Sequence, residues 1–423
     1  MTSNKLGACS LAVFVLSVLR AAPLSSEEQR IVQAVDAQLT EAISFWEKSV
    51  RIDSATDNLP GVRRMGDFYR AEFDALGFST RWIDMPAAMK RAGHLLAERS
   101  GTRGKRLLLI GHLDTVLPGG EFRRDGDRVT GSGVGDMKGG NLILVHALKA
   151  LHAARALDGA QIVVALTGDE ESVGRPMETA RRDLIEVARR SDVALAFENA
   201  VRETVTVARR GYAAWQLEVQ GAMGHSSGIF SAASGSGAVF EAARILHALH
   251  EELREDDGVT FNPALIVGGT DAAIDGTRGT ASGKTNVIAQ RVVINGDIRF
   301  ISSEQLARLK AKMNAIIARH LPRTSAELRW VEETPAMQAT PANYELLRRL
   351  DRVSQDLGFG PVQALDPKLR GYGDISFVAP ILPCLDGLGA RCEASHTPQE
   401  RSDVSALPQL IKRTAVLIHR LTR

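Results

Sequence analysis

The stretch KRLLLIGHLDTV, residues 105–116, decides the fold. Its apolar residues 107–110 stop at a glycine, and His112 and Asp114 follow at once. A short apolar run bounded by charge and glycine is typical of a strand buried on both faces of a parallel sheet, and such sheets bind ligands beyond the carboxyl ends of their strands. Residues two apart in extended backbone point the same way. The pair is therefore either a metal ligand with its orienting partner or part of a solvated loop.

Two further apolar runs end in the same way. Residues 161–167 come before Glu170 and Glu171, and residues 193–197 come before Glu198. Carboxylates this close repel one another by on the order of 1 kcal/mol per pair unless something neutralises them. A single acidic turn is more often solvated. Three buried strands that each end in histidine or acidic residues instead predict a metal site at one edge of one sheet.

A glycine-rich loop supplies another candidate ligand. Residues 131–140 read GSGVGDMKGG and lead into a helix expected at 141–157. Glycine-rich turns before helices can bind phosphate, but this spacing matches neither the Walker pattern nor the dinucleotide fingerprint. Asp136 at the centre of the loop repels phosphate and favours a cation. The loop therefore predicts that Asp136 binds a cation.

Composition excludes some classes of protein. The chain has 423 residues, a formal net charge of +2, and 5% aromatic residues. This length suggests two or three domains. Acidic and basic residues are interspersed with no basic block, and aromatic platforms for bases are sparse. We expect no nucleic-acid partner.

The N-terminus resembles an export signal. Lys5 precedes an apolar run at residues 8–19, and RAAP follows at 20–23. This pattern predicts a cleaved signal peptide at residues 1–22, and the run is short for a membrane-spanning helix. We expect a periplasmic or secreted protein; an uncleaved segment that anchors it in a membrane is the alternative.

Two cysteines remain after this segment, Cys384 and Cys392. In an oxidising compartment they could form a disulfide that closes a small loop. Two buried thiols are the alternative, and the sequence does not decide between them.

The pattern predicts an α/β fold in which a mostly parallel sheet is interrupted by an inserted α+β domain. We expect the main domain at 23–209 and 330–423 and the insert at 210–329. In the main domain, helices are expected at 26–50, 61–75, 342–357 and 404–421. In the insert, strands are expected at 212–219, 263–268, 285–289, 291–300 and 326–331, and helices at 236–252 and 303–320.

Over about residues 27–423 the chain resembles the co-catalytic zinc peptidases that include glutamate carboxypeptidase, acetylornithine deacetylase and succinyl-diaminopimelate desuccinylase. The resemblance rests on GHLDTV with His112 and Asp114, GSGVGDMKGG with Asp136, DEE with Glu170 and Glu171, Glu198, and GHSS with His225. The glutamate carboxypeptidase branch is the most similar, because it is exported and carries Glu at the position of Glu198. The resemblance implies a ferredoxin-like insert that serves as a dimerisation or lid domain.

The resemblance also implies two zinc ions per chain, with other divalent metals such as cobalt possible. One ion takes His112 and Glu198, the other takes Glu171 and His396, and Asp136 bridges them. Such a bridge places two ions roughly 4 Å apart.

Roles for other residues follow from the same resemblance. Asp114 orients His112. Glu170 takes a proton from the bridging water and passes it to the leaving amine. His225 reaches the active site of a partner subunit in a homodimer and stabilises the oxyanion.

Three residues are implied in substrate binding. Asn286 and Arg299 match the family's contacts to a substrate carboxylate, which suits the guanidinium fork of arginine. Arg210 is expected to face the same cleft. The chain departs from the glutamate carboxypeptidases at residues 333–337, which read ETPAM without the arginine found there in that branch.

The expected activity is hydrolysis of a peptide or N-acyl amide bond that releases a C-terminal amino acid. An N-acyl-amino-acid deacylase or dipeptidase is the alternative within the family. A non-catalytic metal-binding or peptide-binding relative is the alternative outside it. This last alternative is disfavoured because the sequence retains all of the implied metal ligands and the implied general base, Glu170.

Overall fold

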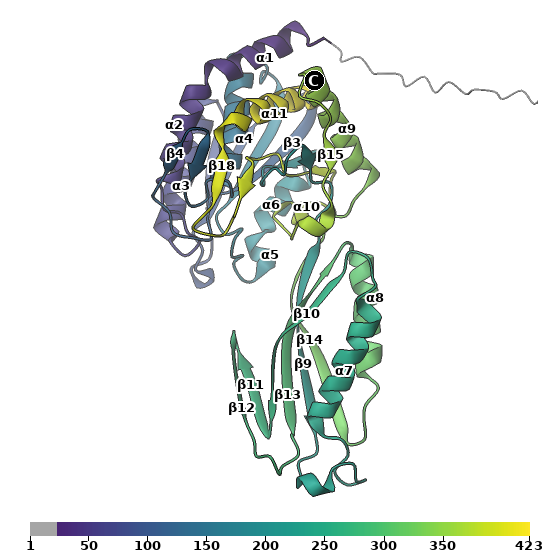
Figure 1. Ribbon diagram of the computed structural model, residues 1–423. Helices are drawn as coiled ribbons and strands as arrows, with labels where there is room; N and C mark the ends of the chain where they lie inside the picture. The colour runs from purple at the N-terminus through teal and green to yellow at the C-terminus, as the bar shows by residue number, and fades with distance from the viewer. Residues whose placement is uncertain (1–22) are drawn as a thin grey trace, which may run out of the picture.

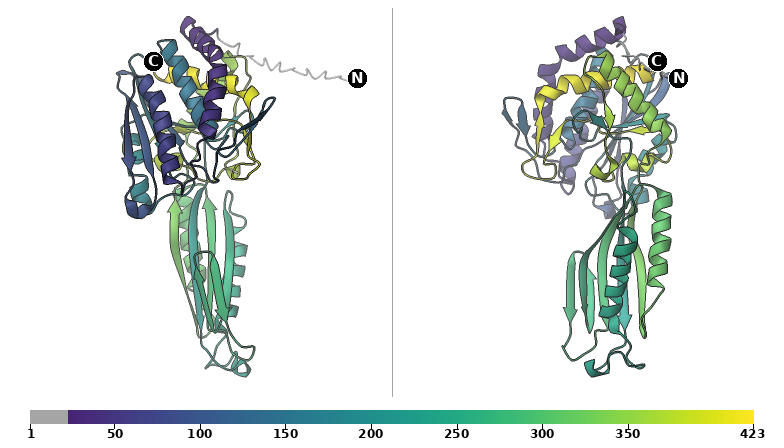
Figure 2. Two further views of the ribbon diagram at one scale, coloured as in Figure 1. Left: turned by 90° about the vertical axis from the view of Figure 1, so that its left-hand side faces the viewer. Right: turned by 45° about the vertical axis from the view of Figure 1, so that its right-hand side comes forward.

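A computed structural model describes residues 23–423, so the predicted signal peptide at 1–22 lies outside the described residues. These residues form a larger body that carries both ends of the described chain and an elongated body that extends from it (Figures 1 and 2). Within residues 23–423, no helix combines the length and apolarity needed to cross a membrane.

The larger body is built on a six-stranded sheet. Its strands, in spatial order, are β1 (Ser79–Asp84), β2 (Gly93–Arg99), β6 (Ala160–Thr167), β3 (Arg103–His112), β7 (Val193–Ala196) and β16 (Cys384–Leu385). β3 pairs in parallel with both β6 and β7, β16 pairs in parallel with β7, and β1 and β2 are antiparallel. The predicted mixed α/β fold with a parallel-rich sheet is confirmed.

The apolar run in β3 serves two cores at once. Leu107 and Leu109 belong to the core on one face of the sheet, whereas Leu108 and Ile110 belong to the core on the other face. Alternate side chains of a strand point to opposite faces, so a strand covered on both sides must be apolar throughout. Each fully buried leucine contributes roughly 1.5–3 kcal/mol.

Helices cover both faces of this sheet (Figure 1). The first core packs beneath α1 (Ser26–Ala37), α2 (Leu39–Val50), α3 (Leu59–Ala75), α4 (Lys138–Ala153), α9 (Pro341–Asp356) and α11 (Leu407–Leu421). The second core packs against α6 (Arg182–Ala188) and α10 (Ile375–Val378), with α5 (Met177–Ala180) beside them. The helix predicted at 26–50 is therefore two helices that meet at Gln38, and the final helix begins at Leu407.

Short strands complete the larger body. A second sheet contains β4 (Arg123–Asp125), β5 (Arg128–Thr130), β17 (Cys392–Glu393) and β18 (Arg401–Asp403), and β8 (Thr204–Val205) pairs with β15 (Gln363–Ala364). Cys384 in β16 is buried, and Cys392 lies in a different sheet. Both cysteines are free thiols in the structure.

The elongated body is an antiparallel sheet with helices on one face (Figure 1). Its order is β10 (Thr260–Gly269), β13 (Arg291–Phe300), β9 (Gly211–Gly221) and β14 (Thr324–Thr334), and α7 (Gly237–Leu253) and α8 (Ser303–Ile317) cover it. The strand predicted at 285–289 is wrong, because Val287 makes only one isolated bridge, to His225. A hairpin of β11 (Asp271–Asp275) and β12 (Arg278–Ser282) was not predicted.

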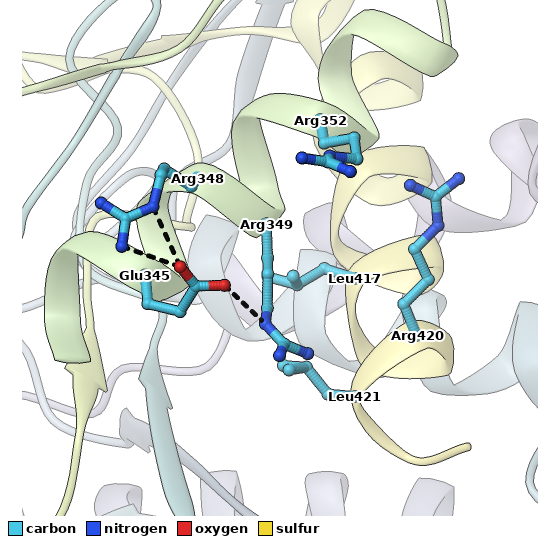
Figure 3. Close-up of a pocket in the computed structure, with 7 residues that line it drawn as sticks. All are labelled: Glu345, Arg348, Arg349, Arg352, Leu417, Arg420 and Leu421. Carbon is cyan, nitrogen blue, oxygen red and sulfur yellow. Dashed lines mark hydrogen bonds and ion pairs between the residues drawn. The ribbon is translucent and has the colours of Figure 1, made fainter. Parts of the chain in front are cut away.

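A pocket of about 310 Å³ on the outer surface lies between α9 and α11 (Figure 3). It is lined by Glu345, Arg348, Arg349, Arg352, Leu417, Arg420 and Leu421. Glu345 pairs with Arg348 at 2.8 Å and with Arg349 at 3.4 Å, and Arg420 pairs with carboxylates of α1 and α9 at 2.7 Å each. These pairs already balance most of its positive charge, and none of the predicted metal ligands lines it.

Candidate metal centre

The carboxyl ends of three neighbouring strands bring the candidate ligands together. His112 is the last residue of β3 and is in register with Thr167, the last residue of β6. The acidic turn after β6 and Glu198 after β7 therefore reach the same edge of the sheet.

Asp136 lies between two histidines, and each of its carboxylate oxygens faces one of them. Oδ1 is 3.2 Å from Nε2 of His112, and Oδ2 is 3.2 Å from Nε2 of His396. His396 Nε2 is also 3.2 Å from Oε2 of Glu171, and His112 Nε2 is 3.8 Å from Oε1 of Glu198. This places one imidazole and one further carboxylate on each side of Asp136.

Two groups of donor atoms are close enough to hold metal ions. His112, Asp136 and Glu171 form one group and His112, Glu170 and Glu198 the other, with ligand atoms within 4.8 Å of one another in each. Imidazole nitrogen and carboxylate oxygen together suit zinc and similar divalent ions. Oε1 of Glu171 is buried without a hydrogen-bond partner among the described residues, as expected of an atom reserved for a ligand. The two groups share His112 and differ from the predicted division of ligands, because Glu170 stands in one of them and His396 in neither. The residues present fit bound divalent cations.

The electrostatics of the site also favour cations. Burial, followed by the charge of Asp136, raises the pKa of Glu198 to about 7, and burial raises the pKa of Glu171. Burial and the neighbouring Glu198 raise the pKa of Glu170 well above its usual range. In contrast, hydrogen bonds from the two histidines outweigh burial and lower the pKa of Asp136. Carboxylates that are buried close together and have raised pKa values are stabilised when metal ions take the place of protons.

Asp114 connects the end of β3 to the acidic turn. Its carboxylate accepts the Thr56 hydroxyl at 2.7 Å and the backbone N–H groups of Glu170 and Glu171 at 3.0 and 3.2 Å. Oδ1 lies 3.4 Å from Nδ1 of His112, the ring nitrogen opposite the one that faces Asp136. Asp114 thus contacts the His112 ring on the side that faces away from Asp136.

The loop that carries Asp136 is held by a residue that sequence reasoning missed. Glu400 accepts backbone N–H groups from Gly133, Gly135 and Asp136 at 2.9, 2.8 and 3.0 Å. A Cβ at Gly135 would lie 2.2 Å from Sγ of Cys392, which explains why glycine is needed there. Glu400 stands in no motif, so no local signal could have revealed it.

A second missed residue is Arg209, whose Nη2 lies 3.5 Å from Oε2 of Glu198. The residue singled out from the sequence was its neighbour Arg210. Arg210 instead donates to the carbonyl oxygen of Lys368 at 3.0 Å and to Thr260 at 3.4 Å. In the described residues, it is Arg209 that reaches the candidate ligands.

Arg299 lies in a hollow of about 560 Å³ at the junction of the two bodies. Its guanidinium lies 4.6 Å from the ring centroid of Tyr212 and 3.1 Å from Asp297. The same hollow is lined by Glu171 and Tyr372. The structure therefore brings Arg299 into one cavity with a candidate metal ligand.

His225 and Asn286 are adjacent to each other and distant from this cavity. The carbonyl of Asn286 accepts the N–H of Ser226 at 3.0 Å, and His225 is exposed. His225 follows the far end of β9, whose run from Gly211 to Gly221 spans about 30 Å at the usual rise of a strand, and Asn286 lies beside it. In this chain they do not approach its own candidate ligands.

His112, Glu170, Glu171 and Glu198 come from the ends of parallel strands, and Asp136 and His396 come from loops beside them. Imidazoles and carboxylates that share an aspartate in this way are typical of two-metal hydrolases. The family model described as Peptidase family M20/M25/M40 matches residues 108–420, and the chain belongs to this family. The chain is accordingly a hydrolytic enzyme, a peptidase or amidohydrolase, and the predicted resemblance is confirmed.

Relatives and solved structures agree with this membership. The chain is 26% identical over 420 residues to carboxypeptidase G2 of Pseudomonas sp. (strain RS-16), covering 96% of each chain. It is 27% identical over 409 residues to succinyl-diaminopimelate desuccinylase of Verminephrobacter eiseniae (strain EF01-2), covering 89% of this chain and 96% of that one.

Two solved structures share the fold. Aminopeptidase PepT from Bacillus cereus ATCC 10987 superimposes with a TM-score of 0.74 at 18% identity, covering 91% of this chain and 99% of that one. The YXEP protein of Bacillus subtilis, a dinuclear metal binding peptidase from the M20 family, superimposes with a TM-score of 0.62 at 14% identity, covering 92% and 99%.

Proposed function

We propose that this protein is a dizinc exopeptidase that releases the C-terminal amino acid from a peptide or an N-acyl amino acid. The observation that carries the proposal is Asp136, because its two oxygens face His112 and His396 at 3.2 Å each. One ion would be held by His112 and Glu198, the other by Glu171 and His396, and Asp136 would be shared. Bound ions of this kind polarise the scissile carbonyl and lower the pKa of the attacking water.

Glu170 is the proposed general base. It is adjacent to the ligand Glu171, and its backbone N–H is fixed by Asp114 at 3.0 Å. Its carboxylate takes a proton from the attacking water and later delivers that proton to the leaving amine, so the amino acid departs with a neutral amine. Asp114 keeps the His112 ring oriented while this happens.

Arg299 is the proposed partner of the substrate's terminal carboxylate, because it lines the same hollow as Glu171. A guanidinium fork binds a carboxylate through two parallel hydrogen bonds. Asn286 is proposed to share this task, from the partner subunit. Arg210 is proposed to contact substrate only at the margin of the cleft, since its guanidinium donates to Lys368 and Thr260.

A homodimer is proposed to complete the site, with His225 stabilising the oxyanion in the partner's cleft. The insert carries an exposed apolar group that could pair two chains. Phe230, Phe240 and Met223 are 68%, 51% and 60% exposed, and the two phenylalanine rings are 5.5 Å apart. Large exposed apolar side chains that cluster in this way mark interaction surfaces.

We further propose that residues 1–22 direct export and are then removed, which gives a periplasmic or secreted enzyme. An N-acyl-amino-acid deacylase or dipeptidase activity is the second candidate function. It is favoured by the absence of an arginine in residues 333–337, where a glutamate-specific pocket would need one.

The test combines a variant with a substrate panel. Glu170→Ala should lower kcat by at least about 100-fold, since general base catalysis contributes that much, while metal analysis still finds two ions per chain. The panel comprises longer peptides, dipeptides and N-acyl amino acids that differ in their C-terminal residue. Cleavage of the longer peptides supports the first candidate function, whereas cleavage confined to dipeptides or N-acyl amino acids supports the second. Wild-type turnover by Glu170→Ala would contradict the mechanism.

A further inference from the structure

Arg209 lies at the base of the elongated body, where the chain enters it and returns from it. Its backbone N–H donates to the carbonyl oxygen of Met337 at 2.9 Å, and its carbonyl oxygen accepts the N–H of Met337 at 3.1 Å. β9 begins just after Arg209, at Gly211, and β14 ends just before Met337, at Thr334. Arg209 therefore lies in the segment that enters the elongated body, and its backbone is hydrogen-bonded to the segment that returns from it.

The Arg209 side chain runs from this base into the metal centre and is 4% exposed. Nε donates to Asp386, a carboxylate with no exposed surface. Nη1 donates to the carbonyl oxygens of Tyr372 at 2.9 Å and Gly371 at 3.3 Å. Nη2 lies 3.5 Å from Oε2 of Glu198 and makes no hydrogen bond within the described part of the chain. The guanidinium is thus held at Nε and Nη1, and its Nη2 lies next to a candidate ligand.

Glu198 presents its two oxygens to different neighbours. Oε1 lies 3.8 Å from Nε2 of His112, on the side of the proposed ion, whereas Oε2 faces Arg209. The terminal torsion of a glutamate is soft, so a free carboxylate can offer a metal either oxygen or both. A guanidinium that is fixed by Asp386 and two carbonyl groups favours the orientation with Oε1 toward the ion.

The contact also joins opposite charges. The guanidinium of Arg209 carries a positive charge and its Nη2 lies 3.5 Å from Oε2 of Glu198, so their attraction holds this oxygen on the side away from the proposed ion.

We propose that Arg209 is a positioning residue that holds Glu198 with one oxygen toward the metal and thereby determines the affinity of one of the two metal positions. The inference rests on the ligand assignment in the proposed function. Partners of metal ligands typically change metal affinity by about 10- to 100-fold when they are replaced. Because Arg209 contacts only Glu198 among the proposed ligands, the effect should be confined to one ion.

The test measures metal binding and not turnover. Metal-free protein is titrated with Co²⁺, followed by visible absorption, and with Zn²⁺ in competition with a chromophoric chelator. Wild-type protein should show two binding steps. Arg209→Lys keeps the positive charge but loses the fork, so one step should weaken by about 10- to 100-fold, with a changed Co²⁺ absorption band, while the other step stays as in wild type.

Arg413→Lys is the matched control. Arg413 is 5% exposed and donates to Ser354 and Glu203, so its replacement also removes a buried fork but touches no proposed ligand. Both of its binding steps should equal those of wild type.

Gly373→Ala perturbs the same contact without removing the arginine, because a Cβ there would lie 2.6 Å from Nη1 of Arg209. It should weaken the same step, and it decides the question if Arg209→Lys does not fold. Unchanged steps in these variants, or an equal weakening of both steps, would overturn the role of Arg209 and leave the ligand assignment standing. Fewer than two steps in wild-type protein would overturn the ligand assignment as well.

Discussion

Glu400 accepts three backbone N–H groups of the loop that carries Asp136. Glu400→Gln would place an amide where these donors need an acceptor, so we expect the free energy of unfolding to fall by roughly 1–3 kcal/mol. Denaturant titration measures the change. Glu393→Gln serves as the control, because the Glu393 side chain is 69% exposed and pairs with Arg401 at the surface, and its effect should stay below about 1 kcal/mol. Equal losses in the two variants would argue against a special role for Glu400.

Candidate ligands at strand ends can be predicted from the sequence. Residues whose partners lie far away in the sequence cannot. His112 and Glu171 could be predicted because an apolar run ends within about four residues before each of them. Glu400 contacts a loop more than two hundred residues earlier in the chain, and that proximity exists only after folding. Arg209 and Arg210 stand together in an irregular segment with no periodicity, so nothing local indicates which guanidinium points inward.

At the scale of elements, the first turn of α1 is connected to the last helix. Ser25 accepts the N–H of Glu28 at 3.2 Å, Glu28 accepts the N–H of Ser25 at 2.7 Å, and Arg420 donates to Glu28 at 2.7 Å. These two reciprocal bonds between Ser25 and Glu28 form a capping box at the start of α1. The bond to Arg420 adds a contact between α1 and α11 that the local pattern does not contain.

Glu28 makes the stability of this junction depend on pH. Burial opposes the charge, but the bonds from Arg420 and Ser25 lower the pKa of Glu28 below its ordinary value of 4.5. Because the folded-state pKa is the lower one, the carboxylate stabilises the fold above about pH 4.5 and loses this contribution as the pH falls through the folded-state value. We expect Glu28→Gln to be less stable than wild type at pH 7, with a difference that shrinks below about pH 4.5. Unfolding free energies measured against pH test this, and a constant difference would contradict it.

Helices and strands could be predicted where burial imposes a regular apolar pattern on the sequence. They were less predictable where contacts with distant residues determine the local structure. The run at 107–110 is apolar because both faces of β3 are covered. The helix at 26–50 breaks at Gln38, whose side chain donates to the carbonyl of His146 in α4, and neither glycine nor proline marks the break. Residues 285–289 form a loop and not the predicted strand, and Ile288 in this loop is buried beneath the start of α7.

At the scale of the whole molecule, the elongated body separates residues that the proposed reaction needs together. The metal ligands lie in the larger body, whereas His225 lies beyond the far end of β9, about 30 Å from where that strand begins. The two bodies meet at a few contacts, among them the pair Arg175–Glu332 and the rings of Tyr212 and Tyr372, 6.2 Å apart. The family resemblance implies that His225 acts in the cleft of a partner subunit, and its distance from the ligands of its own chain is consistent with that proposal.

This separation gives a prediction about mixed dimers. Chains with His225→Ala and chains with Glu170→Ala should each be nearly inactive alone. In a mixed dimer, one cleft combines an intact Glu170 with the intact His225 of its partner, so up to about half of the wild-type activity per dimer should return, because that cleft contains every catalytic group. The two chains are co-expressed with different affinity tags, the doubly tagged dimer is isolated, and its kcat is compared with those of the two parents. The double variant His225→Ala/Glu170→Ala, mixed with wild-type chains, is the control for dilution alone: there each cleft lacks one group, so its activity should stay near the background. A doubly tagged dimer without recovered activity would show that His225 does not act across an interface.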